Sequence, residues 1–122
     1  MHKKTRYVIL LAIIAVFGGL TAWYKLTPGK YDQLATCLTE KKVVFYGAFW
    51  CPHCQATKKA FGKSAKLLPY VECSTPDGNA QQQVCTDAGI KSYPTWIFPD
   101  GSQLSGEQSM EALAEKATCP LP

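Results

Sequence analysis

An uncharged apolar segment near the N-terminus constrains the architecture of this chain more than any other feature. No charged residue occurs among the eighteen residues from Tyr7 to Tyr24. That length is close to the shortest helix that crosses a bilayer. Once this segment is set aside, about ninety residues remain, which is enough for one compact domain and too few for two.

The charges on either side of the apolar segment indicate its orientation. Several basic residues precede it and only Lys25 follows it closely, so the positive-inside bias places the N-terminus in the cytoplasm and the domain outside it. Thr27-Pro28-Gly29-Lys30 has the composition of a turn. The predicted organisation is a cytoplasmic basic tail at residues 1–6, a transmembrane signal anchor at 7–24, a linker at 25–30 and a folded domain at 31–122.

A cleaved secretory signal and a buried core helix are the alternatives for this segment. If Ala22 were the last residue removed, Leu20 would stand where a signal peptidase requires a small side chain. Trp23 and Tyr24 instead suit an aromatic anchor at a membrane interface. The flanking charges argue against a core helix, so a retained anchor is favoured.

The cysteine count and the net charge restrict the setting further. Six cysteines in a small domain after an apolar export segment favour an oxidising, extracytoplasmic compartment. Part of the formal charge of +4 comes from Lys3, Lys4 and Arg6, ahead of the apolar segment. The folded domain is therefore only slightly basic, and no nucleic-acid partner is expected.

Hydrophobic periodicity divides the domain into alternating helices and strands. The Lys42–Trp50 run lacks strict alternation, as expected of a central strand covered on both faces. The predicted elements are helix 31–40, strand 42–50, helix 53–68, strand 70–73, helix 79–88 ended by Gly89, a hairpin of strands 95–98 and 103–105, and helix 109–117. This order predicts an α/β fold with a mixed sheet of about four strands flanked by helices.

The chemical centre of the sequence is Trp50-Cys51-Pro52-His53-Cys54, where the buried strand turns into a helix. A sulfur at the positive end of a helix is stabilised as the thiolate, and His53 can add a charge or a hydrogen bond. Cys51 is therefore the predicted nucleophile, and Cys54, one helical turn later, the resolving thiol. Stabilising the reduced thiolate makes the disulfide form more oxidising.

Two other uses of a Cys-x-x-Cys pair were weighed. Half of a zinc site is disfavoured because the next cysteines, Cys73 and Cys85, have eleven residues between them rather than the usual short spacing. An inert structural disulfide would leave a reactive position unused. Neither a metal nor another cofactor is expected.

The motif FWCPHC after a hydrophobic strand, together with Tyr93-Pro94-Thr95 before another strand, resembles the thioredoxin superfamily over residues 31–119. The resemblance implies a compact thioredoxin-like fold, in which Pro94 is cis and lies against the cysteines. It also implies that the backbone of Tyr93 pairs with the bound substrate. An ordinary proline at a strand edge is the alternative.

The sequence departs from the thioredoxin pattern in one respect. Thioredoxins carry a buried carboxylate six residues before the nucleophile, where this chain has Phe45. Proton transfer at Cys54 then requires water, His53 or another group. Glu72 is the nearest candidate, although a solvent-facing acid at a strand end is the commoner explanation.

A narrower resemblance concerns residues 49–54, 70–74 and 93–96. They are similar to the thioredoxin-like domain fused to, or partnered with, bacterial vitamin K epoxide reductase homologues. This resemblance implies that a quinone-reducing membrane enzyme reoxidises Cys51 and Cys54, which then oxidise exported proteins. The CPHC motif also resembles that of periplasmic disulfide oxidases, although this chain has no room for their large helical insertion.

The four remaining cysteines allow three pairings. Cys73 with Cys85 is favoured because they bracket a short strand-turn-helix unit, and Cys37 with Cys119 would then tie the first helix of the domain to the last. Both bonds would be structural. The alternative is that Cys73 and Cys85 form a second redox pair.

The leading hypothesis for function is a membrane-anchored thiol-disulfide oxidoreductase that oxidises the cysteines of exported proteins. A thioredoxin-like reductase or isomerase, for example in cytochrome c assembly, is the alternative within the same chemistry. A non-catalytic metal-binding or chaperone module is the alternative from another class. Trp50, Pro52, Tyr93 and Trp96 suggest an apolar docking surface, with core packing as the alternative for Trp96.

Overall fold

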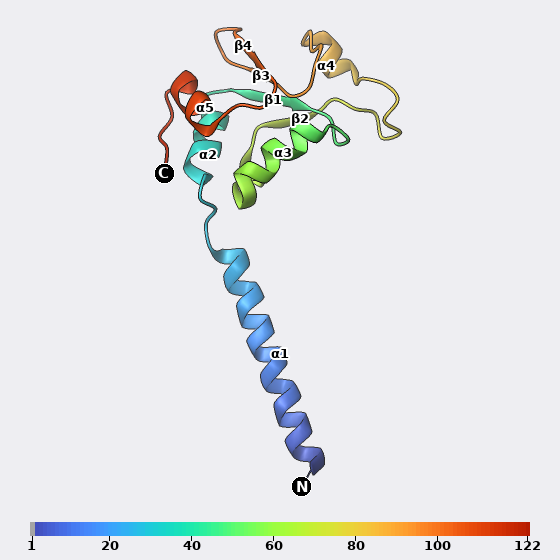
Figure 1. Cartoon of the computed structure of the whole chain (residues 1–122), viewed down its shortest axis with the longest axis vertical. Helices are drawn as coiled ribbons and strands as arrows, with labels where there is room; N and C mark the ends of the chain where they lie inside the picture. Colours follow the sequence, from blue (N-terminus) through green and yellow to red (C-terminus); the bar gives the residue numbers. More distant parts are fainter. Residues whose placement is uncertain (1) are drawn as a thin grey trace.

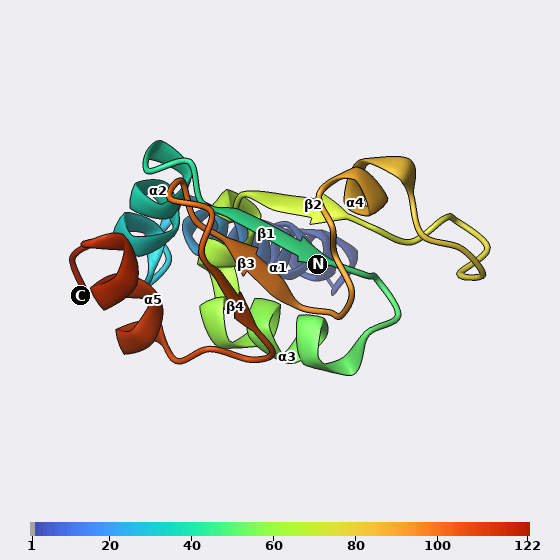
Figure 2. The same ribbon diagram turned by 90° about the horizontal axis from the view of Figure 1, so that it is seen from above.

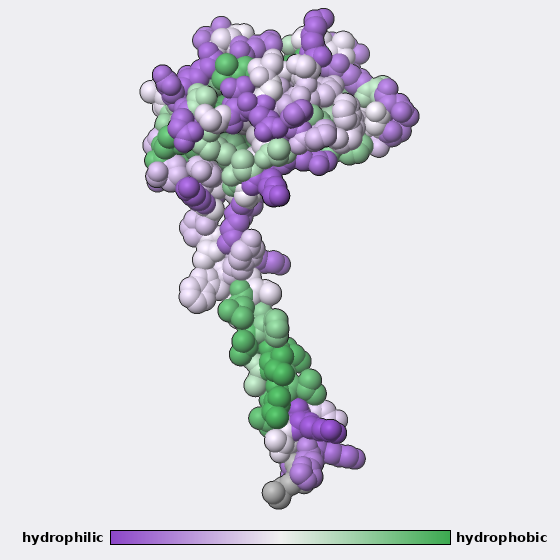
Figure 3. Space-filling view, in the orientation of Figure 1, coloured by the Kyte–Doolittle hydropathy of each residue, from purple (hydrophilic) through white to green (hydrophobic). Residues whose placement is uncertain are grey.

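The computed structural model describes residues 2–122 and consists of a long N-terminal helix and a folded domain at its end (Figure 1). Helix α1 (His2–Leu26) has no buried residue. Its apolar side chains form a continuous band that ends at polar residues near the N-terminus (Figure 3). By length and composition α1 is able to cross a membrane.

Helix α1 extends beyond the predicted membrane segment 7–24 at both ends. It takes in the basic residues from His2 onward and continues through Lys25 and Leu26, the first two residues of the predicted linker. The break in secondary structure is therefore confined to the Thr27–Lys30 turn. Lysine has no tendency to end a helix, so the helix ends at the proline and glycine of this turn.

The domain is built on a four-stranded mixed sheet in the order β2-β1-β3-β4. The central strand β1 (Val44–Gly47) pairs in parallel with β2 (Tyr70–Glu72) and antiparallel with β3 (Thr95–Ile97), which forms a hairpin with β4 (Gln103–Ser105). The predicted α/β architecture and mixed sheet are confirmed. Strand β1 is shorter than the predicted 42–50, because residues 48–50 turn away from the sheet toward α3.

Helices cover both faces of the sheet (Figures 1 and 2). One face packs against α2 (Asp32–Glu40), α3 (Pro52–Phe61) and α5 (Met110–Ala117), whose apolar side chains share one core with Phe45 and Trp96. The other face is covered by α4 (Gln83–Asp87), with Cys85 and Ile90 packed near Tyr46. The alternation of side chains along β1 thus sends Phe45 and Tyr46 to different cores.

Aromatic stacking organises the larger core. The rings of Phe45 and Trp96 are parallel, with centroids 4.3 Å apart, and Phe61 of α3 lies against the same tryptophan. Trp96 is completely buried. It belongs to the core and not to a docking surface, which settles the two alternatives for this residue.

Two predicted helices are shorter than expected. Instead of one helix over 53–68, α3 stops at Phe61 and a 3-10 helix, η1 (Gly62–Leu67), follows, because Gly62 adopts φ 57° and interrupts the α-helical hydrogen bonds. The predicted helix 79–88 is reduced to α4, because Gln81 forms a bridge with Ser74 and continues the preceding loop.

Two disulfides join elements of the domain. Cys73 at the end of β2 is bonded to Cys85 of α4, and Cys37 of α2 is bonded to Cys119, just after α5. Of the three possible pairings, the structure thus has the one that the spacing favours. The second bond holds the C-terminal segment against α2 (Figure 1).

Candidate active site

The two remaining cysteines lie where β1 leads into α3. Cys51 is the N-cap residue of α3, with extended backbone angles, and Pro52 occupies the first turn, where its missing N–H costs no hydrogen bond. Cys54 follows within that turn. Both cysteines are free thiols in the structure. The sulfur of Cys51 therefore stands at a helix start, where backbone N–H groups lack intrahelical acceptors.

The segment before β3 lies against Cys51. The Tyr93–Pro94 peptide bond is cis, and the Cys51 thiol donates a hydrogen bond of 3.7 Å to the Tyr93 carbonyl. Residues 42 positions apart in sequence are thus brought into contact. This contact places the Tyr93 backbone beside the sulfur that an incoming thiol would meet first.

Cys54 lies deeper than Cys51. Its exposed fraction is 1%, compared with 5% for Cys51. Burial, together with a hydrogen bond that the protonated Cys54 thiol shares with Cys51 as donor, raises the pKa of Cys54 to about 12. At neutral pH Cys54 is therefore a protonated thiol, and it ionises only when another group takes its proton.

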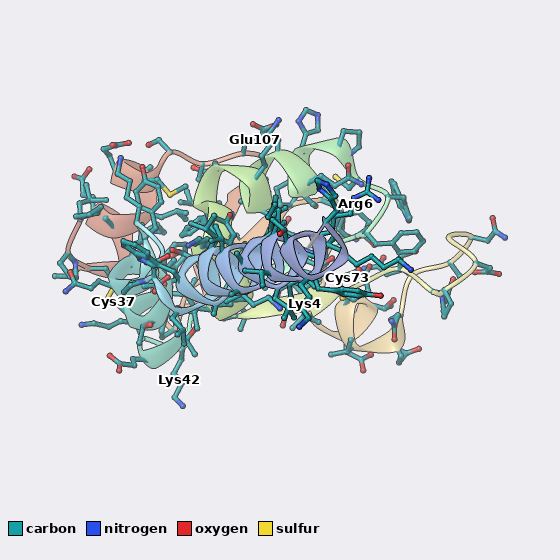
Figure 4. All side chains as sticks on the ribbon, turned by 90° about the horizontal axis from the view of Figure 1, so that it is seen from below. Lys4, Arg6, Cys37, Lys42, Cys73 and Glu107 are labelled. Carbon is teal, nitrogen blue, oxygen red and sulfur yellow. A yellow bond between two sulfur atoms is a disulfide. The ribbon has the colours of Figure 1, made fainter. Side chains whose placement is uncertain are left out.

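His53 points outward between the two cysteines. Its Nδ1 lies 2.6 Å from Oε1 of Glu107, and both side chains are more than half exposed. Glu107 follows β4 and extends alongside α3 (Figure 4). No local feature of the sequence indicates Glu107, because only the folding of β4 against β3 brings it to α3.

An apolar surface borders the dithiol. Phe49 and Trp50 are each 49% exposed. Trp50 is held in place by a 2.9 Å hydrogen bond from its indole nitrogen to the hydroxyl of Ser74 and by an edge-to-face contact with Tyr93. Gly78 packs beneath these two aromatic residues. The site is thus an open surface with a fixed aromatic border.

Glu72, named above as a possible proton acceptor, is held by three hydrogen bonds. Its carboxylate accepts from the backbone N–H groups of Phe49 and Ser74 and, at 2.7 Å, from the hydroxyl of Tyr70. It is therefore not a solvated acid at a strand end. His2, by contrast, lies at the far end of α1 (Figure 1).

Residues 2–122 contain no group of three or more His, Cys, Asp or Glu side chains arranged to hold a metal ion. Thiol-disulfide exchange is the chemistry that two neighbouring unbonded cysteines perform. The fold and the site thus define the class as a dithiol oxidoreductase on a thioredoxin-like scaffold.

Comparison with known proteins agrees with this class. The thioredoxin family model matches residues 23–118. The chain is 46% identical over 87 residues to thiol-disulfide oxidoreductase LTO1 of Arabidopsis thaliana, covering 67% of this chain and 23% of the relative. It is 28% identical over 128 positions to a protein disulfide-isomerase A6 homolog of Drosophila melanogaster, covering 94% of this chain and 29% of the relative.

A third relative is human protein disulfide-isomerase A2, 34% identical over 83 residues, with 60% of this chain and 16% of the relative covered. The chain spans less than a third of the length of each of these relatives. It belongs to the thioredoxin family.

Proposed function

We propose that this chain is a membrane-anchored, extracytoplasmic oxidase that introduces disulfides into exported proteins. The observation that carries the proposal is the position of Cys51 as N-cap of α3, because a helix start stabilises the thiolate that is released when a disulfide is donated. The apolar helix α1, preceded by basic residues, supports the anchor and the orientation.

Disulfide donation proceeds in two exchanges. A substrate thiolate attacks the Cys51 sulfur of the Cys51–Cys54 disulfide, so that a mixed disulfide forms and Cys54 leaves and takes up a proton. A second substrate thiolate then attacks the substrate sulfur of that mixed disulfide. The substrate disulfide forms, Cys51 leaves as a thiolate, and the two electrons of the substrate remain on the dithiol.

Substrate binding is assigned to the surface around Cys51. Trp50 supplies an apolar contact for an extended chain, and the Tyr93 backbone, set by the cis bond to Pro94, pairs with the substrate backbone as the family resemblance implies. Pro52 starts the helix, and His53 adds an exposed polar group in its first turn. The 49% exposure of Trp50 and the 3.7 Å hydrogen bond between the Cys51 thiol and the Tyr93 carbonyl support the two binding roles.

The dithiol must be reoxidised after each cycle. We assign this step to a membrane enzyme resembling vitamin K epoxide reductase homologues, which would pass the electrons to a quinone. The similarity of residues 49–54, 70–74 and 93–96 to the domains that work with such enzymes supports this partner. An anchor in the same membrane would keep the two proteins close.

The equilibrium reduction potential of the Cys51–Cys54 pair tests the direction of exchange. A value near about −120 mV is expected for an oxidase, whereas about −270 mV would assign the chain to the reductases. Cys51→Ser should also abolish oxidation of a reduced substrate protein. The matched control is Ser105→Ala, on the exposed edge strand β4. Oxidation by Cys51→Ser at the normal rate would refute the proposal.

A further inference from the structure

The buried thiol of Cys54 must lose a proton before it can attack and must regain one when it leaves. Water has little access to it, because only 1% of the residue is exposed. The position six residues before Cys51 is Phe45, which is apolar and stacked in the core. Phe45 cannot accept a proton, so the group that exchanges protons with Cys54 lies elsewhere in the site.

Tyr70 is the side chain that lies beside Cys54. Gly47 leaves a space on the sheet, and a Cβ placed there would lie 2.9 Å from the Cys54 sulfur and 2.9 Å from Cε2 of Tyr70. The sulfur and the ring edge are therefore separated by no more than twice that distance. Because Tyr70 pairs with Phe45 in the parallel ladder, it reaches this space from the neighbouring strand.

Tyr70 in turn is hydrogen-bonded to a carboxylate. Residues two apart on a strand face the same side, so Glu72 lies on the Tyr70 side of β2. The Tyr70 hydroxyl donates to Oε2 of Glu72, while two backbone N–H groups hold the other carboxylate oxygen. Glu72 is only half-buried and can exchange protons with solvent.

We propose that Tyr70 and Glu72 form the proton relay of Cys54. When Cys54 attacks the mixed disulfide at Cys51, its proton passes to the Tyr70 oxygen as the Tyr70 hydroxyl proton passes to Glu72. The Cys51–Cys54 bond forms and the partner sulfur leaves as a thiolate. In disulfide donation the same protons move in reverse, from Glu72 through Tyr70 to the departing Cys54 sulfur.

The charges around Tyr70 favour a relay in which the phenol passes a proton on and itself stays neutral. Burial, and then the Glu72 carboxylate, raise the pKa of Tyr70, so the phenol stays protonated. The Lys58 ammonium lies 3.3 Å from the centroid of the Tyr70 ring and favours a thiolate at Cys54. The groups facing the relay are Cys51, Cys54 and Lys58 from the helix side, and Tyr93 from the segment before β3.

The relay acts only in the second of the two exchange steps, so its effect can be measured separately from the first step. The reduced full-length chain in detergent is mixed with oxidised glutathione, quenched with acid at intervals and weighed by mass spectrometry. Cys51 forms the glutathione mixed disulfide in the first step, and Cys54 resolves it in the second. The variants are Tyr70→Phe and Glu72→Gln, with Tyr46→Phe, on the opposite face of the sheet, as the control.

Both variants should slow the second step about 100-fold at pH 7, the scale of general acid-base catalysis, and leave the first step unchanged. The deficit should shrink as the pH rises, because a growing fraction of Cys54 is then already ionised and needs no relay. The double variant should be no slower than the slower single variant, because one path is lost. Tyr46→Phe should behave as the parent chain.

Several results would overturn the relay: an unchanged second step, a deficit equal at every pH, or equal slowing of both steps. If Glu72→Gln does not fold, the Tyr70→Phe variant, which lacks only one hydroxyl group, still tests the relay. The inference rests on dithiol exchange at Cys51. If the parent chain failed to form the mixed disulfide, the proposed function itself would be contradicted, whereas a normal first step with an unaffected second step contradicts the relay alone.

Discussion

At the scale of single residues, the reactivity of the site depends on how little space separates Cys54 from the sheet. Gly47 lies directly beneath it, and Tyr70 shares the gap. The absence of a side chain at Gly47 lets two functional groups approach each other without breaking the β1–β2 ladder. A backbone position thus determines how closely the Tyr70 ring edge can approach the Cys54 sulfur.

Gly47→Ala should destabilise the domain by about 1–3 kcal/mol, because a methyl group in a filled core displaces its neighbours. The added carbon would lie 2.9 Å from both Cys54 and Tyr70. Thermal unfolding followed by circular dichroism measures the loss. Gly19→Ala is the control, since no atom lies within 4 Å of a Cβ at that position. Equal melting temperatures for both variants and the parent would contradict this account.

At the scale of elements, the two disulfides compensate for the small core. They connect α2 to the segment after α5 and β2 to α4, so that helices on both faces of the sheet are tied down. The stabilisation expected from each bond depends on the loop it closes in the unfolded chain. Their sequence separations are 82 and 12 residues.

Removing the long-range disulfide should cost more than removing the short-range one. In the chain-entropy model, the Cys37→Ser/Cys119→Ser variant loses about 4.5 kcal/mol and the Cys73→Ser/Cys85→Ser variant about 3 kcal/mol. Urea unfolding of both variants, with Cys51 and Cys54 kept reduced, gives the two values. A larger loss for the Cys73–Cys85 bond would show that local structure of the loop, and not chain entropy, dominates.

At the scale of the whole molecule, the domain contacts the end of α1 directly. The Lys63 ammonium of η1 donates to the Tyr24 carbonyl and to the Thr27 hydroxyl, and it lies 3.7 Å from the centroid of the Tyr24 ring. A cation at the C-terminal end of a helix is favourable. The domain is therefore held close to the end of the helix, and a membrane crossed by α1 would lie next to it.

Placing charges in the middle of α1 should release the protein from membranes. The Ile13→Lys/Val16→Lys variant adds about 2.5–3.5 kcal/mol per lysine to the free energy of insertion. Alkaline carbonate extraction of membranes should then recover the variant in the supernatant and the parent in the pellet. Trp23→Lys, near the helix end, should stay with the membrane because its ammonium reaches the interface. Extraction of the parent chain would contradict the anchor.

The sequence was sufficient for the features that depend on near neighbours. The apolar run of α1, the strand that leads into Cys51, the order of elements and the hairpin turn all follow from local patterns, and the structure confirms the resulting fold. The lengths of the helices were less predictable. The helix predicted to reach residue 68 stops at Phe61, because the backbone of Gly62 leaves the α-helical region.

Only the tertiary structure decided which side chains surround the dithiol. His53 lies beside Glu107, and Cys54 and Tyr70 border the same space above Gly47, because strands distant in sequence are paired side by side in the sheet. The register of β1 and β2 is a long-range property, and shifting it by one residue would turn Tyr70 and Glu72 to the opposite face. The sequence therefore determined where the reactive sulfurs lie along the chain, while chain packing selected the groups that exchange protons with them.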